Sequence, residues 1–131
     1  GHDTGLALFR NGRLCWAMLS VPTLVRERNV GVQDIVVELP RVYPRERAKA
    51  GPNGLVTLAF RAGTKVGIWK APDTRVHIVQ PADWKGQTPK AVMNKRVLAR
   101  LEVDEVVALG AENDHNVLDA IGIGLFHLGR L

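Results

Sequence analysis

The strongest constraint on the fold is the short segment Asp34–Pro40 (DIVVELP), whose apolar residues follow one another without alternation. A continuous apolar run of this length is typical of a strand buried on both faces, as in the middle of a parallel or mixed sheet. Pro40 cannot donate a hydrogen bond to a neighbouring strand, so pairing should end there. Glu38 is therefore expected at the carboxyl end of a central strand, the edge at which open α/β sheets bind ligands.

Composition favours a single basic domain that works inside the cell. The 131 residues suffice for one core, and no apolar run is long enough to span a bilayer. No secretory signal is visible, and a single cysteine, Cys15, excludes an internal disulfide and a cysteine-rich zinc site. In its apolar surroundings Cys15 is expected to be a small buried side chain. The net charge of +5 is typical of proteins that bind nucleic acid.

The remaining elements follow from periodicity and turn signals. Asn11-Gly12 is a strong hairpin signal, and it predicts an antiparallel pair within residues 5–19. Asp114 or Asn113 is expected to cap a last helix that runs to the end of the chain, with Gly122 and Gly124 close to the sheet. The other expected elements are helices over Pro52–Trp69 and Lys90–Leu101, a strand over Arg75–Val79, a loop over Pro81–Gln87, and a segment over Glu102–Leu109 that is either helical or extended.

Three acids stand at the ends of expected elements: Asp3, Glu38 and Asp119. Carboxylates that converge on one sheet edge repel one another unless a cation lies between them, and Mg²⁺ prefers such oxygen ligands. Two ions could activate a water and stabilise the leaving oxygen of a phosphodiester. The competing interpretation is that Glu38 simply turns to solvent. The basic segment after Glu38 is likewise either a phosphate-binding loop or a solvated face.

The order of four motifs resembles that of RuvC-type Holliday junction resolvases, and it is closest to the bacteriophage branch of that family. The motifs are Asp3–Phe9 (DTGLALF), Ile35–Tyr43 (IVVELPRVY), Pro81–Lys90 (PADWKGQTPK) and Leu118–Leu125 (LDAIGIGL). The resemblance covers nearly the whole chain. It implies one RNase H-like domain over residues 1–131, an α/β fold with a mixed five-stranded sheet flanked by helices. It also implies a homodimer that binds four-way DNA junctions in the cytoplasm of a bacterial host cell.

The resemblance also implies roles for individual residues. Asp3, Glu38 and Asp119 would hold two Mg²⁺ or Mn²⁺ ions and catalyse paired nicks. The family has an acid or histidine three residues before the last aspartate; this chain has Asn116 there, and His115 is the alternative. Residues that would contact DNA are Arg41, Tyr43, Arg45, Arg47, Lys85 and Lys90.

The start of the chain departs from the family pattern. Only Gly1 and His2 precede Asp3, whereas the family has a full apolar strand before its first aspartate. Either the start is trimmed or Asp3 is not the catalytic acid. We favour trimming, because a sheet without its central first strand would make a poor core.

Three functions therefore compete. The first is a crossover junction endodeoxyribonuclease, a metal-dependent enzyme that resolves four-way and other branched DNA. The second is a branched-DNA binding protein of the same fold with little or no cleavage, as Asn116 and the shortened start would permit. The third is a fragment of a sugar or acetate kinase with an RNase H-like fold, which the short length and the basic charge disfavour.

Overall fold

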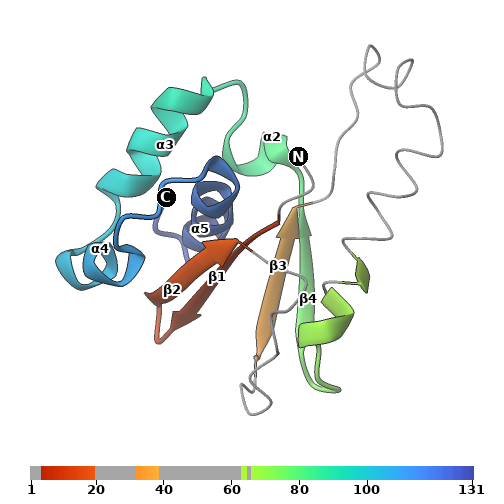
Figure 1. The fold of residues 1–131 in the computed structure, drawn as a ribbon. Coiled ribbons are helices and arrows are strands. Elements are labelled where there is room, and N and C mark those ends of the chain that lie inside the picture. Colours follow the sequence, from red (N-terminus) through yellow and green to blue (C-terminus); the bar gives the residue numbers. More distant parts are fainter. Residues whose placement is uncertain (1–3, 20–31, 39–62, 65) are drawn as a thin grey trace. The chain divides into compact units, whose positions relative to one another are not determined.

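The computed structural model describes residues 4–19, 32–38, 63–64 and 66–131, and these form a mixed α/β structure with two two-stranded sheets (Figure 1). The chain divides into two compact units. The first unit contains Gly1–Leu24 and Trp84–Leu131, and the second contains Val25–Asp83. None of the helices in the described ranges combines the length and apolarity needed to cross a bilayer.

The first unit begins with the expected antiparallel hairpin of β1 (Gly5–Arg10) and β2 (Arg13–Leu19). Asn11 and Gly12 form the turn with φ of 52° and 76°. Two successive left-handed residues give the turn a twist that matches the twist of the strands, which explains the Asn-Gly preference. The register shifts between Leu8 and Phe9.

Two helices pack against this hairpin and a third packs against one of them, and together the three supply most of the core. The last helix, α5 (His115–His127), packs against β1 and β2, α4 (Val103–Leu109) packs against β2, and α3 (Lys90–Ala99) packs against α5. The approach of α5 is close, because a Cβ at Gly124 would overlap the ring of Phe9 on β1. The largest fully buried apolar side chains come from α3 and α5: Met93, Val97, Val117, Ile121 and Leu125.

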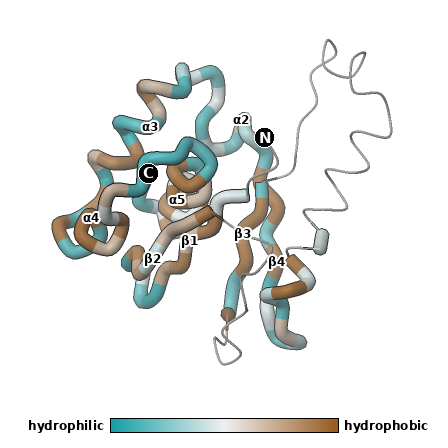
Figure 2. The backbone as a smooth tube through the Cα atoms, viewed as in Figure 1, coloured by the Kyte–Doolittle hydropathy of each residue, from teal (hydrophilic) through white to brown (hydrophobic). Residues whose placement is uncertain are grey.

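The second unit is built on a parallel pair of strands. Strands β3 (Asp34–Glu38) and β4 (Arg75–Val79) have the bounds that the sequence predicts, and Glu38 pairs with Val79 at their shared carboxyl end. Figure 2 shows hydrophobic stretches along both strands. All five residues of β3 are nevertheless only half-buried, because β3 pairs with β4 alone among the described residues. The described residues therefore do not show the expected five-stranded sheet, whereas the expected α/β class is confirmed.

Several expected boundaries require correction. The expected loop Pro81–Gln87 begins with a short helix, α2 (Pro81–Trp84), where the Asp83 carboxylate accepts a hydrogen bond from the Gln80 N–H at 2.7 Å. Proline favours a first helical position because it has no N–H to leave unpaired. Helix α3 begins at Lys90, as expected, and ends at Ala99 rather than at Leu101. The segment Glu102–Leu109, which the sequence predicts as either helical or extended, contains helix α4. Helix α5 ends at His127 rather than at the chain end.

The prediction that Cys15 is buried is wrong. Its neighbour Leu14 is buried, and alternation along β2 then turns the Cys15 side chain to solvent. The segment Leu14–Leu19 is apolar on both faces, so its sequence gave no sign of which face lies inward. Of the expected helix Pro52–Trp69, residues 63–64 and 66–69 are described and are helical, and the rest lies outside the described residues.

A buried acid, Glu105, joins the hairpin to α4 and to the end of the chain. Its side chain is fully buried and accepts a hydrogen bond from the Leu14 N–H at 2.7 Å. It also closes a capping box with Glu102 at the start of α4. The Arg130 guanidinium pairs with Glu105 at 2.9 Å and donates to the Gly12 carbonyl at 2.7 Å. Hydrogen bonding to Arg130 lowers the pKa of Glu105 from about 4.5 to about 2, although burial opposes this shift.

We expect Glu105→Gln to lower the free energy of unfolding at pH 7 by about 3–5 kcal/mol, because it leaves a partly buried Arg130 without its partner charge. Urea unfolding followed by tryptophan fluorescence measures this loss. The matched control is Asp104→Asn on the same helix, which removes an exposed partner of Arg13 and should change stability far less. Equal losses in the two variants would contradict a special role for Glu105.

The lowered pKa also predicts a pH dependence. A carboxyl whose pKa is depressed by folding stabilises the folded state above its unfolded pKa, and this stabilisation is lost as the pH falls. For Glu105 the loss should run from about pH 4.5 to about pH 2 and amount to about 3 kcal/mol. Urea unfolding of Glu105→Gln across this range should show a correspondingly shallower decline than the wild type does.

Candidate functional site

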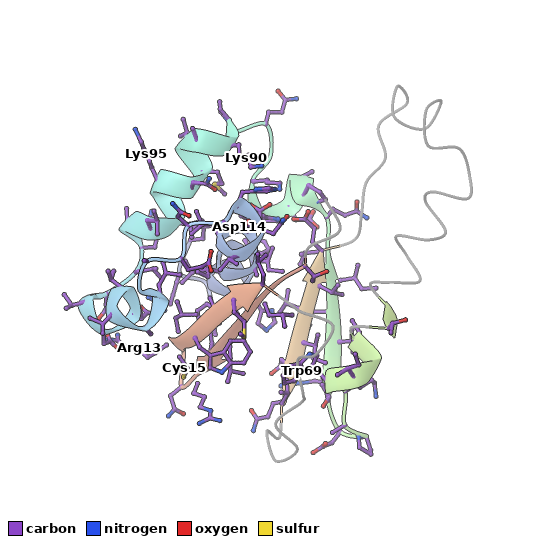
Figure 3. The ribbon with its side chains drawn as sticks, viewed as in Figure 1. Arg13, Cys15, Trp69, Lys90, Lys95 and Asp114 are labelled. Carbon is purple, nitrogen blue, oxygen red and sulfur yellow. The ribbon has the colours of Figure 1, made fainter. Side chains whose placement is uncertain are left out.

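The last candidate acid, Asp119, lies in the second turn of α5. Its helix begins at the expected cap, where the Asp114 carboxylate accepts a hydrogen bond from the Asn116 N–H at 2.8 Å (Figure 3). The cap fixes the start of the helix. Asn116 and Asp119 are three residues apart in this helix, so their side chains lie on the same face. Both are half-buried, whereas His115, the first helical residue, is exposed.

The start of β1 lies directly against this first turn of α5. A Cβ at Gly5 would overlap the backbone carbonyl of Asn116. Only glycine permits so close an approach of two backbones. The strand that follows the Asp3-Thr4 dipeptide is thereby in contact with the helix that carries Asp119. Asp3 itself lies outside the described residues.

Lys85 is the cationic partner of Asp119. Its Nζ lies 3.4 Å from the Asp119 carboxylate, and the two side chains are only 27% and 30% exposed. The same ammonium lies over the ring of Trp84, 4.8 Å from the centroid. Trp84 is buried against α5, because Gly122 leaves room for its ring. Trp84 thus connects Lys85, which was expected to contact DNA, with Gly122, which was expected to lie close to the sheet, and no local sequence signal indicates this connection.

Glu38 occupies the position that the sequence predicts, as the last residue of β3 in the second unit. It is half-buried at the carboxyl end of a parallel pair, where α/β proteins place ligands. Of the expected DNA contacts, Lys85 and Lys90 are described, and Lys90 is exposed at the start of α3 (Figure 3). Arg41, Tyr43, Arg45 and Arg47 lie outside the described residues.

Another carboxylate of the second unit, that of Asp34, lies at the opposite end of β3 from Glu38. The Asp34 carboxylate is 2.8 Å from His77 Nε2 and 3.1 Å from Arg75 Nε. Hydrogen bonding to His77 lowers the pKa of Asp34, and Arg75 adds to the effect. Both partners come from β4, so this cluster links the two strands. His77 therefore has the structural role that its position in a strand favours.

The donor set around Asp119 suits a hard divalent cation. The Asp119 carboxylate and the Asn116 amide both offer oxygen atoms, the ligands that Mg²⁺ and Mn²⁺ prefer. The resemblance implies an acid or a histidine at position 116, and the neutral amide there is a weaker metal ligand than a carboxylate. Asp119 would therefore supply the negative charge of this pair of donors.

Comparisons with protein-family models, with curated proteins and with solved structures found no match to this chain. The resemblance to junction resolvases therefore rests on the motifs in the sequence.

We expect Gly5→Ala to destabilise the protein by about 1–3 kcal/mol, because the added methyl group must push β1 away from the first turn of α5. Thermal unfolding measures the change. The matched control is Gly67→Ala, where a helical glycine has open space around its Cβ position, so alanine should stabilise the protein slightly. A neutral Gly5→Ala would show that the two backbones are not in close contact.

Proposed function

We propose that this protein is a metal-dependent endonuclease that resolves four-way and other branched DNA junctions by paired phosphodiester hydrolysis. The observation that carries the proposal is the half-buried Asp119 carboxylate, held on α5 beside the start of β1 with Lys85 next to it. A metal-binding acid and a phosphate-binding cation are the two parts that hydrolysis of a phosphodiester requires.

The proposed reaction uses Asp119 together with Glu38. The two acids, with Asp3, would hold two Mg²⁺ or Mn²⁺ ions. The metal supplies an activated water and stabilises the leaving oxygen. Glu38 supports this role because it ends a parallel strand, and Asn116 or His115 would complete the ligands from the first turn of α5.

We propose further that the two strand pairs belong to one mixed five-stranded sheet. Isolated two-stranded sheets are marginally stable, and the apolar sequence of β3 suits a strand with neighbours on both sides. A sheet of this kind would bring Glu38 and Asp119 to one edge. A crystal structure with Mn²⁺ would test this arrangement directly, because both acids should ligate the same metal centre.

The proposed substrate follows from charge as well as from the motif order. The chain carries a net charge of +5, and the exposed basic residues of α3 add to Lys85 on the same unit. A homodimer would place two active sites on opposite arms of a junction, as paired nicking requires. The alternative function, binding of branched DNA with little or no cleavage, is favoured by one observation: Asn116 offers an amide where the resemblance implies an acid or a histidine.

We expect the protein to make paired nicks in a labelled immobile four-way junction with Mg²⁺ but not with EDTA. Glu38→Gln and Asp119→Asn should each reduce nicking at least about 100-fold, since even changes beyond the ligand shell cost 10–100-fold. Asp104→Asn, which changes an exposed acid of α4, is the matched control and should nick as the wild type does.

Tight junction binding without nicking in any metal would favour the binding protein over the nuclease. Equal affinity for the junction and for linear duplex would overturn the proposed substrate class. Nucleotide-dependent phosphate transfer to a sugar or to acetate would favour the kinase interpretation.

The exposed Lys90 is expected to contact a DNA phosphate. Lys90→Ala should therefore weaken binding to junctions of every sequence alike. The slope of log affinity against log salt concentration should fall by about one, because one phosphate contact releases about one counterion. Fluorescence anisotropy at several salt concentrations measures the slope, with Lys70→Ala of the second unit as a charge-matched control. Equal slopes for wild type and Lys90→Ala would remove Lys90 from the interface.

A further inference from the structure

The contact between Lys85 and Asp119 places a cation at the carboxylate to which the proposed metal must bind. The ammonium lies 3.4 Å from the carboxylate, and both side chains are more than two-thirds buried. Partial burial reduces solvent screening, so this pair interacts more strongly than an exposed pair would. The negative charge of Asp119 is thus already balanced within the first unit.

The position of Lys85 is fixed by its neighbours. Trp84 is 6% exposed, and its ring lies on α5 at Gly122, where any side chain would collide with it. The Lys85 ammonium lies over this ring, and a cation over an indole is attracted to the negative face of the ring. Trp84 and Gly122 therefore act as positioning residues that hold the Lys85 ammonium beside Asp119. Asp119 lies three residues before Gly122 on α5.

A divalent metal and an ammonium that share one carboxylate repel each other, so each weakens the binding of the other. We propose that Lys85 and the divalent metal compete for Asp119, so that metal binding releases the Lys85 ammonium to a DNA phosphate. The proposal rests on the proposed nuclease function, and it adds a regulation of that site. Lys85 lowers metal affinity while DNA is absent, and it strengthens DNA binding once metal is present.

The first test measures binding of Mg²⁺ or Mn²⁺ alone, by isothermal titration calorimetry without DNA. Lys85→Met keeps the aliphatic stem and removes the charge, so metal should bind about two- to five-fold more tightly, the range expected for losing one partly exposed ion pair. Lys95→Met on α3 removes the same charge elsewhere and should leave metal affinity unchanged. Lys85→Arg keeps a cation and should bind metal nearly as the wild type does.

A second, spectroscopic measurement follows the lysine itself. The ¹³Cε resonance of Lys85, assigned by its loss in Lys85→Met, should shift as Mg²⁺ is added and should saturate at the same concentration as the calorimetric curve. In nicking assays Lys85→Met should need less Mg²⁺ for half-maximal rate but should have a higher KM for the junction. A structural role alone would not move these two quantities in opposite directions.

The outcomes separate this inference from the function on which it rests. If Asp119→Asn weakens metal binding but Lys85→Met does not tighten it, competition is overturned and the nuclease stands. If Asp119→Asn leaves metal binding unchanged, the metal does not bind at Asp119, and both proposals fail at this site. Thermal unfolding of each variant confirms that the comparison is made between folded proteins.

Discussion

The close approach of α5 to its neighbours is the constraint on which the first unit depends. Gly5 lets β1 reach the first turn of the helix, Gly122 makes room for the Trp84 ring, and Gly124 makes room for Phe9. Each of these glycines has a low helix or strand propensity and would weaken an isolated element. Packing compensates for that weakness, because the helix then buries Val117, Ile121 and Leu125 completely.

The same packing gives Asp119 its environment. A carboxylate on an exposed helix would be solvated and would bind a cation weakly, whereas Asp119 lies half-buried beside Lys85.

Much of the secondary structure could be predicted because its signals are local. The Asn11-Gly12 turn, strands β3 and β4, and the Asp114 cap each depend on residues within one short segment. Glu38 could be placed at a strand end for the same reason. The exposure of Cys15 could not be predicted, because β2 is apolar on both faces and tertiary contacts decide which face is buried.

Non-local contacts explain most of what the sequence did not reveal. The burial of Glu105 depends on Leu14 and Arg130, which are distant in sequence, although the spacing of Glu102 and Glu105 does match a capping box. The pairing of Lys85 with Asp119 likewise joins residues 34 positions apart. The convergence of Asp119 with Glu38 remains a prediction from the motifs, since the two acids belong to different units.

The hydrogen bond from Arg130 to Gly12 has a consequence for the order of folding. It joins residues 118 positions apart, so the turn of the first hairpin gains this partner only after Arg130 has been synthesised. Until then the buried Glu105 carboxylate lacks its counter-charge, which should weaken the docking of α4 on β2. The hairpin can form early from its own local turn, but the completed unit should be a late and slow product of folding, as is typical of structures rich in distant contacts.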